Sequence, residues 1–188
     1  MHRLFNKKQI LTIPNMLSLV RLLLIPIILW LYIGEQNNWA AIAVIALSGL
    51  TDVVDGRIAR KFNMVSDFGK ILDPIADKLT QGSLILCLTV TYDWMKWLIV
   101  LFIAKECVMA GMGLLVIKQK DSVNSAQWHG KLSTVMLYAT MILLIMFPGM
   151  PIPLVNTLIV ACAFVILMSL VLYTRFYIGL FGGKGEKR

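Results

Sequence analysis

One stretch of the sequence indicates how the chain must fold. Residues 51–78 read TDVVDGRIARKFNMVSDFGKILDPIADK, and they carry five of the ten acidic residues of a 188-residue chain that is 59% hydrophobic. The sequence on both sides of this stretch is apolar over long segments. Carboxylates clustered between apolar segments are typical of a polar site built into a membrane protein. The composition therefore favours a membrane protein that forms a single domain, residues 1–188.

The apolar segments predict six membrane-spanning helices and an all-α integral membrane protein. A helix needs about 20 apolar residues to cross the hydrocarbon layer of a bilayer. Six segments approach this length, and short polar or Gly- and Pro-containing breaks separate them. They are Asn15–Ile33, Trp39–Leu50 with a helical continuation through Arg60, Pro74–Val90, Trp94–Ile117, Leu132–Met146 and Pro153–Tyr173.

Basic residues predict the orientation of these helices, because cytoplasmic connections are enriched in Lys and Arg. With the N-terminus inside, the three outer connections contain one basic residue, Lys96, whereas both termini and the two long inner connections are basic. We therefore expect six transmembrane helices in the cell membrane, both termini cytoplasmic, and the aspartates at the cytoplasmic side. Lipid headgroups account for the basic excess, so we expect the bilayer as a partner and no nucleic acid.

The aspartates fall into two pairs that can share helix faces. Asp52 and Asp55 are three residues apart, and Asp73 and Asp77 are four apart. A short connection joins the two helices, so the pairs can face each other. Four adjacent carboxylates in an apolar environment cost about 10 kcal/mol on insertion scales, so a positive charge must lie between them. Hard divalent cations with oxygen ligands, such as Mg²⁺, Mn²⁺ or Ca²⁺, fit this requirement.

A simpler interpretation is that these aspartates are helix caps and interfacial charges. Asp73 directly precedes Pro74 and would make a reasonable N-cap. Capping does not account for Asp55, Gly56 and Arg60 at the end of the other helix. Asp67 lies in the connection, where we expect a solvated or turn-forming role.

The spacing of the whole stretch resembles a family signature. Residues 52–77 read DVVDGRIAR, eight further residues, and GKILDPIAD, which is D-x-x-D-G-x-x-A-R-x8-G-x3-D-x3-D with every fixed position filled. This pattern resembles the signature of the CDP-alcohol phosphotransferase family. The segments IPNMLSLVR and GKLST, at residues 13–21 and 130–134, resemble its phosphatidylglycerophosphate synthases and eukaryotic-type cardiolipin synthases.

The resemblance implies a reaction in which an alcohol attacks the diacylglycerol-bearing phosphate of CDP-diacylglycerol and CMP leaves. It implies that Asp52, Asp55, Asp73 and Asp77 hold two divalent cations, Mg²⁺ or Mn²⁺, and that Asp77 is also the general base. It places seven residues at the CDP-diacylglycerol site, namely Asn15, Ser18, Gly56, Ala59, Arg60, Ser66 and Gly69. Helix packing, capping or an interfacial anchor are the alternative roles of these seven residues.

The sequence indicates the acceptor alcohol less clearly than the donor, CDP-diacylglycerol. Phosphatidylglycerophosphate synthases carry an arginine–glutamate pair in the fourth span, and here Lys105 precedes Glu106. Lysine is a point charge and lacks the planar fork of arginine. We expect Lys105 and Lys131 to contact the acceptor, with a Lys105–Glu106 ion pair and a membrane anchor at Lys131 as alternatives. Glycerol-3-phosphate, which gives phosphatidylglycerophosphate, is the first expectation, and phosphatidylglycerol, which gives cardiolipin, is the second.

Small residues in the fourth span suggest a helix-packing surface. Gly111 and Gly113, with Ala104 and Ala110 nearby, allow close approach of another helix. The family resemblance implies a homodimer at such a surface. Packing within one subunit is the alternative.

A cation transporter is a more remote alternative, because carboxylates within a membrane can mark an ion path. The acidic residues of the motif gather at one side of the predicted bilayer, and no inverted repeat is visible in the sequence.

Overall fold

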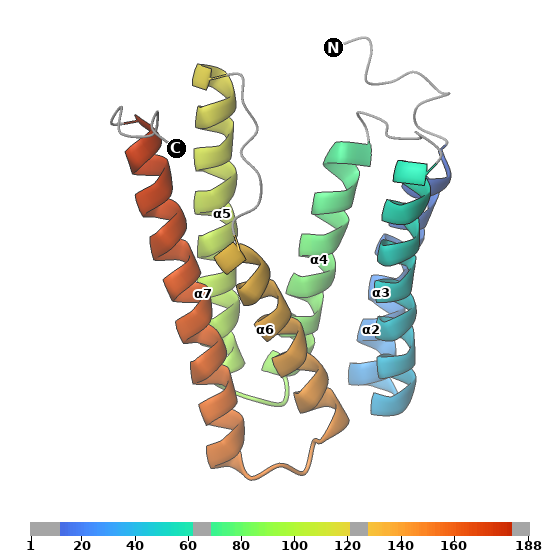
Figure 1. The fold of residues 1–188 in the computed structure, drawn as a ribbon. Coiled ribbons are helices and arrows are strands. Elements are labelled where there is room, and N and C mark those ends of the chain that lie inside the picture. The colour runs from blue at the N-terminus through green and yellow to red at the C-terminus, as the bar shows by residue number, and fades with distance from the viewer. Residues whose placement is uncertain (1–11, 62–68, 121–127, 182–188) are drawn as a thin grey trace. The chain divides into compact units, whose positions relative to one another are not determined.

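The computed structural model describes residues 12–61, 69–120 and 128–181, and every element among them is a helix (Figure 1). The all-α prediction is confirmed for these residues. The elements are α2 (Ile13–Leu29), a π-helical turn η1 (Trp30–Gly34), α3 (Asn38–Lys61), α4 (Gly69–Thr89), α5 (Met95–Lys120), α6 (Trp128–Met146) and α7 (Ile152–Phe181).

The helices form two compact units, Met1–Val90 and Thr91–Arg188, which are described separately. In the first unit α2 packs against both α3 and α4, and in the second α7 packs against both α5 and α6. One helix thus holds each unit together. In the first unit that helix is α2, which therefore lies against the helix that carries Asp73 and Asp77.

The start of α4 differs from the predicted one. The sequence favours a helix from Pro74, but α4 begins at Gly69 and Pro74 lies inside it. A proline that deep in a helix removes one backbone hydrogen bond, and the contacts that the next turn makes with α2 offset this cost. Asp73 is therefore a residue of the helix itself, and the N-cap interpretation of Asp73 is wrong.

A tight turn makes α2 and α3 antiparallel neighbours. Gln36 adopts the left-handed region with φ of 52°, and its side-chain amide donates to the Ile33 carbonyl at 3.0 Å. The Asn37 side-chain oxygen accepts a hydrogen bond from the Ala40 amide at 3.0 Å, which caps the N-terminus of α3. The segment GEQNN, residues 34–38, thus contains the end of one helix and the beginning of the next.

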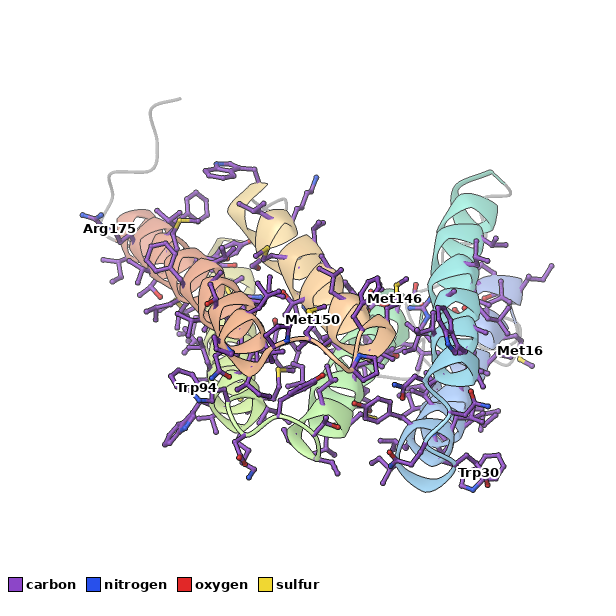
Figure 2. The ribbon with its side chains drawn as sticks, turned by 90° about the horizontal axis from the view of Figure 1, so that it is seen from below. Met16, Trp30, Trp94, Met146, Met150 and Arg175 are labelled. Atoms are coloured by element: carbon purple, nitrogen blue, oxygen red, sulfur yellow. The ribbon has the colours of Figure 1, made fainter. Side chains whose placement is uncertain are left out.

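Two segments are long and apolar enough to cross a membrane, Ile13–Gly34 and Ile152–Gly179, and α3 and α6 contain shorter apolar stretches. Large hydrophobic side chains are exposed on every described α-helix, and Trp30 and Trp94 project outward (Figure 2). Examples are Leu23, Leu50, Leu79, Val100, Val135 and Phe164. Exposed apolar surface of this extent indicates a membrane protein. Six spans and cytoplasmic termini stay predictions.

Helix α6 lies close to the Tyr173 side chain of α7 at Gly130. A Cβ atom added at Gly130 would lie 2.9 Å from Cε2 of Tyr173 and closer still to its hydroxyl oxygen. The Tyr173 side chain is buried and has little room to withdraw. Only glycine therefore fits at this position without displacing the Tyr173 side chain.

Gly130→Ala should lower the melting temperature, because the added methyl group overpacks the contact at a cost of about 1–3 kcal/mol. The matched control is Gly49→Ala in α3, where no described atom beyond the neighbouring helix backbone lies within 4 Å of the added Cβ. That change should leave stability equal or raise it by up to about 1 kcal/mol, since alanine favours helix. Thermal unfolding of the purified variants measures both. Equal melting temperatures for the two variants would contradict the close contact.

Candidate active site

Helix α2 turns a polar face inward. Asn15, Ser18 and Arg21 follow one another at three-residue spacing, and their exposed fractions are 1%, 0% and 2%. The other side of the helix is apolar and exposed. Met16 projects from it (Figure 2), and Leu23 is exposed two turns further on. A helix that is polar inside and apolar outside suits a polar site that is surrounded by lipid.

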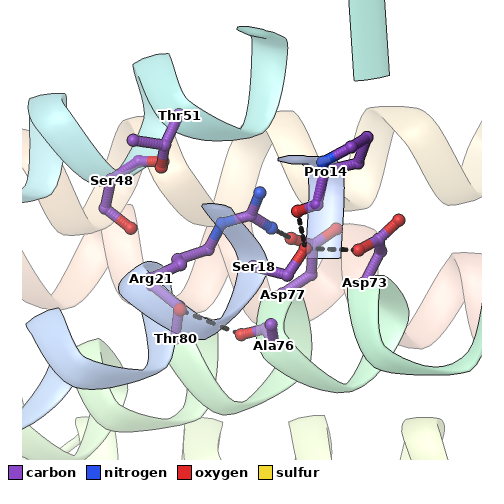
Figure 3. Close-up of polar contacts among 9 residues, drawn as sticks. All are labelled: Pro14, Ser18, Arg21, Ser48, Thr51, Asp73, Ala76, Asp77 and Thr80. Atoms are coloured by element: carbon purple, nitrogen blue, oxygen red, sulfur yellow. Dashed lines mark hydrogen bonds and ion pairs between the residues drawn. The ribbon is translucent and has the colours of Figure 1, made fainter. Parts of the chain in front are cut away.

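Ser18 links α2 to α4. Its hydroxyl lies 3.1 Å from the carbonyl oxygen of Pro14, one turn earlier, and also hydrogen-bonds Oδ1 of Asp73 (Figure 3). A hydroxyl has one proton, so it donates to one of these oxygens at a time. The carboxylate is the stronger acceptor. The contact therefore holds the Asp73 side chain toward α2.

Arg21 forms an ion pair with Asp77, one turn further along both helices. The guanidinium Nη1 donates to Oδ1 of Asp77 (Figure 3). The Arg21 side chain is 2% exposed, whereas the Asp77 side chain is 38% exposed. The pair is thus asymmetric, with a buried cation and a carboxylate that remains accessible from outside.

The two carboxylates of α4 lie on one face of the helix, as their spacing predicts. Both side chains turn toward α2, and both are partly exposed (Figure 3). The hydroxyl of Thr80 on the following turn bonds the Ala76 carbonyl at 2.9 Å. Partly exposed carboxylate oxygens with fixed neighbours fit a hard divalent cation, so Asp73 and Asp77 are suitable ligands.

The second predicted pair lies on α3, but its side chains are not among those that the structure describes. Helix α3 runs unbroken through residues 52–60, so Asp52 and Asp55 belong to a helix that packs against α2. Ser48, one turn before Asp52, is buried, and the Thr51 hydroxyl donates to its carbonyl at 2.6 Å. No group of three metal-binding side chains occurs among the described residues. The side chains of the two α3 aspartates are not among them.

The structure describes some of the predicted nucleotide-binding residues and not others. Asn15 and Ser18 are buried on α2, and Gly69 is buried at the first residue of α4. The side chains of Ala59 and Arg60 on α3, and the position of Gly56 relative to its neighbours, are outside the description. Ser66 falls in residues 62–68, which also lie outside it.

The two predicted acceptor residues lie in the second unit. Lys105 is 6% exposed, and its ammonium donates to Oε1 of Glu106 at 2.9 Å, so the ion pair is present. Lys131 is exposed near the beginning of α6. The charge of Lys105 is thus largely compensated, and Lys131 is the more accessible of the two cations.

Sequence reasoning missed Arg21. Arg21 is a single charge within an apolar segment, and such a charge does not by itself indicate a functional site. Its spacing of three from Ser18 and six from Asn15 places the three side chains on one helix face, and this signal could have marked it as part of the site.

Residues 11–176 match the family model of CDP-alcohol phosphatidyltransferases. The chain belongs to this family. The resemblance of the aspartate motif is thereby confirmed, and membership in a transferase family removes the support for a cation transporter.

The family relatives carry two kinds of name. A Streptomyces coelicolor protein named cardiolipin synthase (CMP-forming) is 35% identical over 143 residues, which cover 73% of this chain and 66% of the relative. A Mycobacterium tuberculosis protein named "Probable phosphatidylglycerophosphate synthase" is 35% identical over 134 residues, which cover 69% of this chain and 63% of the relative. The matched segment is thus slightly less than two thirds of each relative's length.

Proposed function

We propose that this protein transfers a phosphatidyl group from CDP-diacylglycerol to an alcohol, with release of CMP. The observation that carries the proposal is the pair Asp73 and Asp77, both turned toward the polar face of α2, within a family motif whose every position is filled. The family match spans both compact units, which supports one catalytic domain over residues 1–188.

The proposed cofactors are two divalent cations, Mg²⁺ or Mn²⁺, held by Asp52, Asp55, Asp73 and Asp77. When bound, these cations would neutralise phosphate charge and stabilise the attacking and leaving oxygens. Asn15, Ser18, Gly56, Ala59, Arg60, Ser66 and Gly69 are the proposed CDP-diacylglycerol contacts. Arg60 would bind a phosphate through two N–H groups.

Asp77 is the proposed general base. The alcohol oxygen forms a bond to the phosphorus that carries diacylglycerol, the bond from that phosphorus to the CMP oxygen breaks, and Asp77 accepts the proton of the alcohol. A carboxylate has about four acceptor positions, so the Arg21 contact at Oδ1 leaves capacity for a proton. The partial exposure of Asp77 gives a substrate hydroxyl access to it.

The proposed setting is the cell membrane, with six spans, both termini in the cytoplasm and the site at the cytoplasmic side. The distribution of basic residues supports this orientation. CDP-diacylglycerol is itself a lipid, so a site at the edge of an apolar bundle lets its acyl chains remain in the bilayer.

Asp52→Asn, Asp55→Asn and Asp73→Asn should each abolish CMP release while the protein remains folded, because each removes an anionic ligand for a divalent cation. Chelation should abolish it reversibly, with recovery on addition of Mg²⁺ or Mn²⁺. The assay is CMP release from CDP-diacylglycerol by the purified protein. Asp93→Asn is the matched control, since Asp93 is exposed and pairs with Lys96 in the α4–α5 connection. Full activity in excess EDTA would exclude the proposed cations.

Glycerol-3-phosphate is the proposed acceptor, with phosphatidylglycerol as the second candidate. Exposed Lys131 is available for a free phosphate group, which supports the first. Compensation of Lys105 by Glu106 weakens a phosphate contact there, and the Streptomyces coelicolor relative is named cardiolipin synthase, which supports the second.

Lys131→Ala should raise KM for glycerol-3-phosphate about 10- to 150-fold, the equivalent of a charge-assisted contact worth about 1.5–3 kcal/mol. KM for CDP-diacylglycerol should change little. Lys105→Arg should preserve or improve the use of glycerol-3-phosphate, because it restores the fork of the common family pattern. Lys96→Ala, which changes an exposed lysine in the first turn of α5, is the control. A wild-type protein that consumes phosphatidylglycerol but ignores glycerol-3-phosphate would reverse the order of the two acceptors.

We also propose a homodimer through the small residues of α5. Ala104, Ala110 and Gly111 are exposed, and no described atom lies within 4 Å of a Cβ added at Gly111 or Gly113. Within the second unit, packing of the described residues therefore does not use these glycines. Cross-linking in intact membranes should give a dimer that Gly111→Leu weakens. Monomer alone in the wild-type protein would rule the dimer out.

A further inference from the structure

Among the described residues, a buried cation faces a proposed metal ligand. Arg21 lies on the inner face of α2 and is 2% exposed. A guanidinium cannot give up its proton in a protein, so it carries its charge permanently. A permanently charged group that is so well buried requires an anion beside it. The anion with which it forms an ion pair is Asp77.

We infer that Arg21 is a built-in counter-cation for Asp77, which stabilises the site before any divalent cation binds and lowers the affinity with which one binds there. The inference rests on the proposed function, because it takes Asp77 as a ligand. Arg21 is a positioning residue in this scheme and acts on the reaction only through Asp77.

The asymmetry of the ion pair supports this role. Arg21 approaches from the buried side, while the Asp77 side chain is 38% exposed. A divalent cation can therefore reach the carboxylate without the guanidinium leaving. Both positive groups would then share one carboxylate, and their mutual repulsion would oppose binding.

The neighbouring contact provides an uncharged comparison. Ser18 holds Asp73 through a neutral hydroxyl, one turn away on the same two helices. This contact orients a carboxylate and adds no charge. Removal of the Ser18 hydroxyl and removal of the Arg21 charge should therefore affect cation binding differently, although both contacts join α2 to α4.

Two other roles would explain a buried arginine. The long side chain could serve helix packing alone, in which case its charge would be irrelevant to cations. It could instead orient Asp77 as a ligand, as partners of metal ligands commonly do, and its loss would then weaken cation binding. The three roles predict different changes in the response to cations.

The experiment is thermal unfolding of the purified full-length protein, first freed of metal and then titrated with Mn²⁺ or Mg²⁺, with no lipid substrate present. Arg21→Met, which keeps the length and removes the charge, should lower the melting temperature of the metal-free protein by at least about 5 °C. The cation-induced rise should be larger than in the wild type. The half-saturating Mn²⁺ concentration should fall about tenfold or more, since one repulsive charge is gone.

The matched variants separate charge from shape. Arg21→Lys keeps a positive charge and should behave like the wild type toward Mn²⁺. Ser18→Ala removes the neutral contact and should not lower the half-saturating Mn²⁺ concentration. The double variant Arg21→Met with Asp77→Asn should regain metal-free stability relative to Arg21→Met alone, because the Asp77 charge is no longer left without the Arg21 charge beside it. If Arg21→Met does not fold, recovery in the double variant still supports the inference, and a double variant that also fails to fold overturns it.

The remaining outcomes also decide between the proposals. A fall in melting temperature that is equal with and without cations indicates packing alone and overturns the inference. A higher half-saturating concentration in Arg21→Met indicates an orienting role and overturns it as well. A wild-type protein that responds to no divalent cation overturns both this inference and the proposed cofactors. A normal wild-type response with an unchanged response in Arg21→Met overturns the inference alone.

Discussion

The first unit depends on the need to pair a buried charge. Arg21 lies on the buried face of α2, whose exposed face is apolar. A buried guanidinium requires an anion beside it, so a carboxylate must lie against α2. Asp77 meets this requirement, and because α4 is a rigid helix, Asp73 is brought to the same face one turn earlier. The position of the proposed active site thus follows from the ion pair and the helical repeat. The tight turn at Gln36 then places α3, with the other two motif aspartates, next to the same helix.

The helices were predictable because the period and length of apolar segments are properties of local sequence. The predicted continuation of the second helix through Arg60 agrees with α3, which ends at Lys61. The start of α4 was not predictable, since proline favours the first turn of a helix and Pro74 lies instead inside α4. What overrides the local preference is tertiary, namely the contacts of Asp73 and Asp77 with another helix.

The carboxylates of the candidate site were predictable, whereas the pairing of Arg21 with one of them was not. Asp73 and Asp77 share a face because four-residue spacing forces them to do so. Arg21 finds its partner 56 residues away in sequence, and no pattern within one helix indicates such a pairing. Lys105 shows the converse, because its partner Glu106 is the next residue and the ion pair was one of two expected readings. The choice of acceptor alcohol depends on whether such cations pair with a carboxylate of the protein or with the substrate. The identity of the residues alone does not determine this.

The distance in sequence between Arg21 and Asp77 has a consequence for biosynthesis. A ribosome adds about 5–20 residues per second, so Asp77, 56 positions after Arg21, is added roughly 3–11 s later. During that interval α2, in a segment apolar and long enough to enter a membrane, carries a charge before Asp77 has been synthesised. An arginine side chain is long enough to keep its charge near water or headgroups during this interval, and formation of the ion pair then joins α2 to α4.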